Sequence, residues 1–259
     1  MKYLSIDLET TGLDPDHCDV IEFAAVLDDT TKPEVPIDQL PSFRALLVQD
    51  FYRGEPYALA MHKELLNEVC GRGAFASSAR SELAHDGGVI TDGGTAVSYQ
   101  LRPFDLFSDF ERWLVNVGML KLQDIPTRLD GKQPKILVAG KNFAGFDLRF
   151  LRRMAGNWDR LFSHRVLDPA MMFIRADDEK PPSLEQCLGR AGFSDGVTHT
   201  ALNDARDVVR CIRGGFAKSA ERVAPEKRLR ACEACKGPGS TLWNDYAGRY
   251  LCSRCATPE

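Results

Sequence analysis

The sequence of 259 residues lacks any run of about 20 apolar residues, the length that a helix needs to cross a membrane. Its first residues, MKYLSIDLE, include acidic side chains and lack the apolar segment of a secretory signal peptide. We therefore expect no membrane span, and we expect the protein to be cytoplasmic.

A strong positive charge is also missing. The net charge is −4 and the isoelectric point is about 5.8. The charge is unevenly distributed, because residues 1–215 hold 25 basic and 32 acidic side chains whereas residues 216–259 hold 8 and 5. The sequence therefore excludes binding of nucleic acid through a general positive field, and such binding has to rely on local patches or bound metal ions.

The eight cysteines do not suggest a disulfide framework. Four of them, Cys18, Cys70, Cys187 and Cys211, are scattered, and we expect these to be buried or inert thiols. The other four form two C-x-x-C pairs near the end of the sequence. In a chain without a secretion signal, such pairs favour metal binding over disulfides.

Length and a hydrophobic content of 44% predict one sizeable globular domain with a small appendage. Strands are expected over 2–8, 20–29 and 43–50, and their short or turn-rich links suggest an antiparallel meander. Further strands and helices alternate later, which predicts an α/β fold with a mixed sheet covered by helices. The expected strands are 135–140 and the start of 164–173, and the expected helices are 56–69, 103–119, 146–156, 183–192 and 200–216.

Two segments mark the organisation of the chain. Residues 71–98 are rich in Gly, Ser and Asp, and we expect a long surface loop that either gates the substrate or is a disordered excursion. Residues 217–231 are charged and nearly lack large apolar groups, as in a linker. The predicted organisation is a main domain over 1–216, this linker, and a small domain over 232–259.

The stretch IDLETTG places two carboxylates in an otherwise apolar strand. Asp7 and Glu9 are two residues apart, so they share one face of the strand. Two such carboxylates raise each other's pKa unless a cation lies between them, and their oxygens suit Mg²⁺ or Mn²⁺. The alternative is an edge strand with two solvated acids.

Two later segments carry further candidates. Asp147 starts a predicted helix directly after a buried strand, and His199 precedes a predicted helix that contains Asp204 in its first turns. Taken singly, an aspartate at a helix start is typical of a cap. A single histidine before a helix is usually structural.

The three segments IDLETTG, KNFAGFDLRFL and HTALNDARD, in this order, resemble the three motifs of the DEDDh family of 3′–5′ exonucleases. This family includes proofreading subunits, ribonuclease T and oligoribonuclease. The segments GEPYALAMHKELL, RVLDPAMMF and PPSLEQCLGRAG also follow the family order, so the resemblance covers roughly residues 1–215.

The resemblance implies an RNase H-like fold, with a mixed five-stranded sheet flanked by helices, and a site for two Mg²⁺ or Mn²⁺ ions. By this resemblance Asp7, Glu9 and Asp204 hold one ion, and Asp7 and Asp147 hold the other. Two such ions can stabilise both the attacking and the leaving oxygen of a phosphodiester. His199 is implied to take the proton from the attacking water, a role that suits imidazole at neutral pH.

The resemblance also implies substrate contacts. The turn Thr10–Thr11–Gly12 and Leu13 are expected along the terminal nucleotide, where Gly12 allows close approach. Three other residues have two open interpretations each: Phe146 stacks on a base or packs in the core, Asn142 binds near the sugar or holds its loop, and His62 lines the cleft or caps a helix face. Asn142 is five residues before Asp147, whereas proofreading subunits have four and oligoribonucleases have the longer spacing. Asp168 is expected to be structural.

The C-terminal cysteines follow the pattern C-x₂-C-x₁₆-C-x₂-C, which fits one structural zinc ion bound by Cys232, Cys235, Cys252 and Cys255. The segment STLWNDYAGRYLC between them is expected to form a hairpin. So short a domain needs a metal to fold. Redox-active pairs and an iron–sulfur cluster are the alternatives.

The purpose of this zinc ribbon stays open among three possibilities. It binds nucleic acid through Lys236, Arg249, Arg254 and its aromatic residues, it docks a protein partner, or it only stabilises the C-terminus.

The sequence thus predicts a metal-dependent 3′–5′ exonuclease that acts on single-stranded DNA or RNA 3′ ends and releases nucleoside 5′-monophosphates. The polarity and the product come from the resemblance. The alternative is a non-catalytic nucleic-acid-binding or scaffold protein that keeps the fold, and the presence of all five motif residues argues against it.

Overall fold

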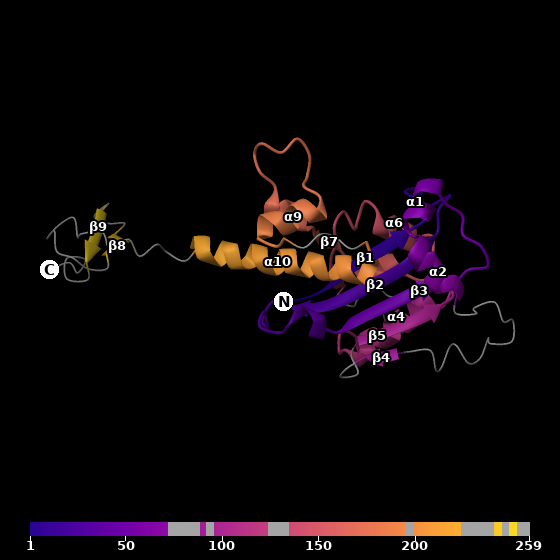
Figure 1. The fold of residues 1–259 in the computed structure, drawn as a ribbon. Helices are drawn as coiled ribbons and strands as arrows, with labels where there is room; N and C mark the ends of the chain where they lie inside the picture. Colours follow the sequence, from indigo (N-terminus) through magenta and orange to yellow (C-terminus); the bar gives the residue numbers. More distant parts are fainter. Residues whose placement is uncertain are drawn as a thin grey trace. The chain divides into compact units, whose positions relative to one another are not determined.

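The computed structural model divides the chain into two compact units, Met1–Gly215 and Phe216–Glu259, which are described separately (Figure 1). No helix among the described residues is both long enough and apolar enough to cross a membrane. The residues that the structure describes are 1–71, 89–91, 96–123, 135–194, 199–223, 241–244 and 249–252.

The first unit is built on one mixed sheet of seven strands in the order β4-β5-β3-β2-β1-β6-β7. The first three strands of the chain form the expected antiparallel meander, whereas β6 runs parallel to β1 and to β7, and β5 runs parallel to β3. The bounds are β1 Lys2–Thr10, β2 Val20–Asp29, β3 Ser42–Leu47, β4 Val89–Thr91, β5 Ala96–Leu101, β6 Ile136–Ala139 and β7 Phe162–Leu167.

The expected number of five strands was wrong. The two additional strands are β4 and β5, which pair antiparallel with each other and extend the sheet beyond β3. The strand β4 and the first residues of β5 fall within 71–98, the segment expected to be one long loop. Short apolar runs at Val89–Thr91 and Ala96–Leu101 become strands because the free edge of β3 offers backbone hydrogen bonds. Residues 72–88 and 92–95 lie outside the described residues.

Helices cover both faces of the sheet, as expected for this α/β architecture. One face packs against α4, α6 and α7, and the other packs against α8, α9 and α10. Figure 1 shows α10 lying along the sheet near β1 and β2. The bounds are α1 Pro56–Met61, α2 Lys63–Gly71, α4 Leu106–Asn116, α6 Asp147–Leu151, α7 Trp158–Leu161, α8 Pro169–Phe173, α9 Leu184–Ala191 and α10 Ala201–Val223, with a short 3₁₀ helix at Ile37–Gln39.

Strand alternation decides where the carboxylates of β1 point. Leu4, Ile6 and Leu8 enter the core on the α4 side of the sheet. Tyr3 packs on the opposite side, in the cluster formed with α8, α9 and α10. Because Asp7 and Glu9 have the same parity as Tyr3, they face α10.

The helix predictions were confirmed in type, with differences at the ends. The helix expected over 56–69 divides at His62 into α1 and α2. Ser183 and Gln186 form the reciprocal capping box at the start of α9, and Gly192 ends this helix in the left-handed conformation. The short helix α7 was not expected.

The second unit contains the antiparallel hairpin of β8 (Thr241–Asn244) and β9 (Arg249–Cys252), which confirms the expected hairpin. Cys232, Cys235 and Cys255 lie outside the described residues, and of Cys252 only the backbone is described. The zinc site therefore stays a prediction. In the first unit Cys18, Cys187 and Cys211 are buried as expected, whereas Cys70 is exposed.

Candidate active site

Three carboxylates from two distant segments meet on one face of the sheet. Asp7 and Glu9 come from β1, and Asp204 comes from the first turn of α10. One oxygen of each carboxylate lies within 4.8 Å of the others. Donor atoms at this spacing can bind the same metal ion, so the structure brings together the three residues predicted to share one.

Asp147 joins this cluster through the backbone of β1. It is the first residue of α6 and only 2% exposed, and its Oδ1 accepts a hydrogen bond of 3.1 Å from the N–H of Leu8. The strand β6 pairs with β1 only at Leu4 and Ser5, so β1 extends beyond its neighbour on that side. The carboxylate of Asp147 therefore accepts the hydrogen bond that a neighbouring strand would otherwise accept. The donor, Leu8, is the residue between Asp7 and Glu9.

Burial is the largest electrostatic influence on the four carboxylates. It raises the pKa of Glu9 to about 8, with added repulsion from Asp204, Glu22 and Asp147. It raises the pKa of Asp147 to about 8, and that of Asp204 to about 7 with help from Asp207 and Glu22. The pKa of Asp7 is raised well above its usual range by burial and then by Asp147 and Asp204. Without a cation, the ionised forms of these carboxyl groups are therefore disfavoured relative to carboxylates in water.

The residues fit a hard divalent ion. Besides the clustered oxygens, the buried Oδ1 of Asp204 has no hydrogen-bond partner among the described residues. A buried polar atom without a partner is costly, and a metal ion would remove that cost. Carboxylate oxygens are the ligands that Mg²⁺ and Mn²⁺ prefer.

Two histidines are candidates for the site: His62 contacts one of its carboxylates, and His199 is five residues before Asp204 in the sequence. His199 is exposed and sits two residues before α10, with a positive φ of 52°. His62 is buried between α1 and α2, and its Nε2 is 3.4 Å from Oε2 of Glu9. Burial lowers the pKa of His62, and charge repulsion from His199 lowers it further. His62 thus both ends a helix and reaches the site.

The turn after β1 is held tightly from within. The hydroxyl of Thr10 donates to the carbonyl of Gly12 at 2.8 Å, and the hydroxyl of Thr11 accepts from the N–H of Asp19 at 2.7 Å. A Cβ at Gly12 would come within 2.5 Å of Cys18 Sγ, so only glycine fits there. Leu13, four residues after Glu9 in the sequence, is 70% exposed.

The loop before α6 is anchored by Asp168. The N–H of Asn142, which has a φ of 58°, donates to Oδ2 of Asp168 at 2.9 Å. Oδ1 of Asp168 accepts from the N–H of Ala170 at 2.8 Å and caps α8, which agrees with the expected structural role. The side chain of Asn142 is exposed. Phe146 is half-buried against the core, 5.1 Å from the ring of Phe150, which favours packing over base stacking.

Glu22 was not predicted from the sequence. This side chain of β2 is completely buried, directly opposite Glu9 in the strand pairing. Its carboxylate pairs with Nε of Arg44, and its Oε2 accepts from the N–H of Ala201 at 3.1 Å. A glutamate in the apolar run VIEFAAVL was the available signal.

Comparison with known proteins finds nucleases that are similar to this chain in sequence or in fold. No family model matches the chain. An oligoribonuclease from Enterobacter sp. (strain 638) is 28% identical over 204 residues, which cover 79% of this chain and 87% of that protein. The nuclease domain of 3′hExo, a DEDDh family member bound to rAMP, has the same fold, with a TM-score of 0.51, 15% identity, and coverage of 85% of this chain and 94% of that domain.

E. coli exonuclease I, solved in complex with a dA16 oligonucleotide, aligns at 16% identity and a TM-score of 0.47. The alignment covers 85% of this chain but only 42% of that protein, so the chain spans less than half of its length.

The resemblance predicted from IDLETTG, KNFAGFDLRFL and HTALNDARD is confirmed by the oligoribonuclease relative and by the shared fold. The chain is thus similar in sequence to an oligoribonuclease, and it shares its fold with the nuclease domain of a DEDDh family member.

Proposed function

We propose that the chain is a metal-dependent 3′–5′ exonuclease that hydrolyses the last phosphodiester bond of single-stranded DNA or RNA and releases nucleoside 5′-monophosphates. The proposal rests on one observation: Asp7, Glu9 and Asp204 each place a carboxylate oxygen within 4.8 Å of the other two. Asp147, hydrogen-bonded to Leu8, completes the set.

The carboxylates are proposed to hold two Mg²⁺ or Mn²⁺ ions. Asp7, Glu9 and Asp204 would hold one, and Asp7 and Asp147 the other. When bound, such ions supply Lewis-acid stabilisation of the phosphoryl oxygens and of the leaving oxygen. The raised pKa values of Glu9, Asp147 and Asp204 support this assignment, because four carboxylates in a buried site need positive charge to stay ionised.

His199 is proposed as the general base that takes a proton from the attacking water. It is exposed to water and is five residues before Asp204 in the sequence, and an imidazole is suited to accept a proton near neutral pH. His62 is proposed as a positioning residue, because its Nε2 lies 3.4 Å from Glu9 and fixes that carboxylate.

The terminal nucleotide is proposed to lie along Thr10–Gly12 and the exposed Leu13. The tight internal hydrogen bonds of this turn support a rigid surface, and a rigid surface loses little entropy on binding. Asn142 is proposed to contact the terminal sugar, since its side chain is exposed while its backbone is held by Asp168.

The C-terminal unit is proposed to bind one zinc ion through Cys232, Cys235, Cys252 and Cys255. The cysteine spacing and the β8–β9 hairpin support this proposal. The ribbon would bind the nucleic acid strand, since the positive charge of the chain collects there. Docking of a protein partner is the alternative role.

The proposal is tested with 5′-labelled ten-nucleotide DNA and RNA strands in Mn²⁺. The wild-type protein should shorten the strands from the 3′ end and give a ladder of labelled products. Asp7→Ala should lose about 10³-fold in rate, since one residue serves both ions. Asp14→Ala is the matched control, because this aspartate is exposed and lies just outside the site. Equal rates for Asp7→Ala and the wild type would contradict the proposal, and binding without hydrolysis would favour the scaffold alternative.

A further inference from the structure

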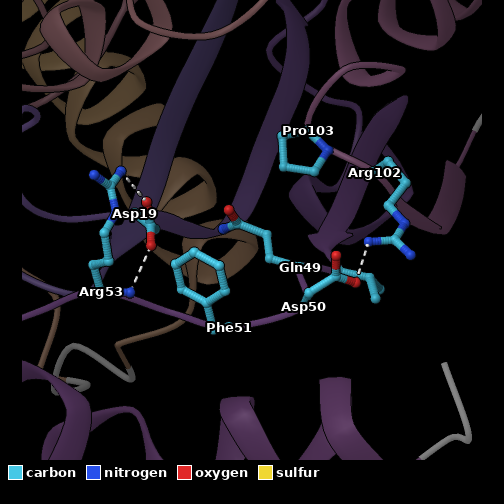
Figure 2. A pocket seen from close by; sticks show the side chains of 8 residues that line it. Asp19, Gln49, Asp50, Phe51, Arg53, Arg102 and Pro103 are labelled. Carbon is cyan, nitrogen blue, oxygen red and sulfur yellow. Dashed lines mark hydrogen bonds and ion pairs between the residues drawn. The ribbon is translucent and has the colours of Figure 1, made fainter. Parts of the chain in front are cut away.

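A pocket of about 360 Å³ opens beside the turn that follows β1, and none of the four site carboxylates lines it. It is formed where β3 ends and where β5 leads into α4. Figure 2 shows the side chains that line it. The lining residues that matter here are Asp19, Gln49, Asp50, Phe51, Arg53 and Arg102.

The pocket is joined to the candidate active site by hydrogen bonds. The N–H of Thr11 donates to the carbonyl of Asp19 at 2.9 Å, and the hydroxyl of Thr11 donates to the carbonyl of Arg53. The N–H of Glu55 in turn donates to the carbonyl of Thr11 at 2.8 Å. Thr11 is two residues after Glu9, so the pocket wall is attached to the turn proposed to carry the terminal nucleotide.

Among the residues that line the pocket, the aromatic one is Phe51, which is 71% exposed. Figure 2 shows its ring among the polar side chains of Asp19, Gln49 and Arg53. Exposing an apolar ring to water is unfavourable in free energy, and a flat molecule that stacks on the ring removes this unfavourable exposure. Flat heterocycles stack on such rings irrespective of their sequence, as in proteins that bind single-stranded nucleic acid.

The charges of the pocket favour a base over a phosphate. Arg53 is paired with Asp19 at 2.8 Å, and Arg102 is paired with Asp50 at 3.0 Å. The two arginines and two aspartates leave no net charge among these four residues. A phosphate site needs unbalanced positive charge, whereas a nucleobase is neutral.

We propose that this pocket binds a nucleobase of the single-stranded substrate, upstream of the terminal nucleotide, by stacking on Phe51. The inference rests on the proposed function, because the strand is brought to the pocket by its 3′ end in the site. The pocket makes strands that extend to it better substrates than a single nucleotide ester.

The test compares a substrate that is long enough to reach the pocket with one that is not. The p-nitrophenyl ester of thymidine 5′-monophosphate has no upstream nucleotide, whereas a 5′-labelled dT10 strand has several. Phe51→Ala should lower kcat/KM on dT10 by about 5- to 100-fold, mainly through KM, because one stacked base is lost. The same variant should leave hydrolysis of the ester unchanged, and Phe51→Tyr should retain the wild-type rate on both.

Phe104→Ala is the matched control, because this phenylalanine is 78% exposed and does not line the pocket. It should leave both rates unchanged. The inference is overturned if Phe51→Ala leaves dT10 hydrolysis unchanged, if it slows both substrates equally, or if Phe104→Ala slows dT10 hydrolysis as much.

Binding measurements separate this inference from the proposed function. If the wild type hydrolyses neither substrate, the proposed function fails, and fluorescence anisotropy of labelled dT10 still tests the pocket. Phe51→Ala should then weaken binding about 5- to 100-fold without changing the slope of log Kd against log salt. An unchanged Kd contradicts the inference, and a reduced slope also does, since it assigns the pocket to phosphate.

Discussion

The carboxylate of Glu22 accepts a hydrogen bond from the backbone N–H of Ala201, 3.1 Å away and 179 residues further along the chain. Ala201 is the first residue of α10, so this bond holds the start of the helix against the first residues of β2. His199 and Asp204 lie on either side of Ala201 in sequence. Glu22 therefore positions two residues of the site without belonging to the metal-binding set.

Glu22→Ala is expected to lower the free energy of unfolding by about 3 kcal/mol, because it removes one partner of a buried ion pair. Arg44 keeps Glu68 as a partner at 3.2 Å, which limits the loss. Urea unfolding measures the effect, with the exposed Glu34→Ala as the control. A loss below about 1 kcal/mol would show that Glu22 does not hold α10.

Asp147→Asn is expected to separate activity from stability. The amide oxygen can still accept from Leu8, while the buried negative charge disappears. Hydrolysis should fall by about 10³-fold because a metal ligand is weakened, and the metal-free protein should become more stable at pH 8. Rate measurements in Mn²⁺ and urea unfolding in EDTA check the two effects. Loss of stability at pH 8 would contradict the assigned burial cost.

The pH dependence of stability should reveal the protonated carboxylates. In the metal-free protein the pKa values of Glu9 and Asp147 are about 8 and that of Asp204 is about 7. The unfolded chain releases these protons at about pH 4, so between about pH 4 and pH 8 the folded state holds more protons. Stability is therefore greatest at low pH and falls as the pH rises toward 8.

Magnesium ions should oppose this loss by replacing the protons. The increase in Tm on adding Mg²⁺, relative to EDTA, should be larger at pH 8 than at pH 5. Thermal unfolding followed by circular dichroism at the two pH values measures the difference. The same increase at both values would indicate that Mg²⁺ binds away from these carboxylates.

The C-terminal unit is expected to contain one zinc ion per chain. Metal analysis of protein purified without chelator tests this, with Cys235→Ser as the variant that should lose zinc. Hydrolysis of the p-nitrophenyl ester of thymidine 5′-monophosphate should remain in this variant, because the four site carboxylates belong to the other unit. Wild-type protein without zinc would contradict the prediction of a zinc ribbon.

The sequence predicted those features of the site that depend on local pattern. Alternation along β1 directed Asp7 and Glu9 to one face, and the motif order identified Asp147 and Asp204 as their partners. The hydrogen bond from Leu8 to Asp147 was not predictable, because it depends on β1 extending beyond β6. Glu22 was missed for a similar reason, since its partners Arg44 and Ala201 come together only in the folded chain.

The strands rich in apolar residues were predicted, whereas β4 and β5, which lie in or next to a segment rich in Gly, Ser and Asp, were missed. β4 has only three residues, and the segment around it is rich in Gly and Asp, so the composition of that segment resembled that of a loop. Its place in the sheet comes from pairing with β5, which itself depends on the edge of β3. Such edge strands are decided by long-range pairing rather than by local propensity.

The central claim is that four carboxylates and divalent ions cut a strand from its 3′ end. The most direct measurement is chromatography of the small products released by the wild type from a 5′-labelled ten-nucleotide strand in Mn²⁺. We predict one nucleoside 5′-monophosphate for each nucleotide removed, and no release in EDTA. Internal fragments, nucleoside 3′-monophosphates or equal release in EDTA would contradict the account.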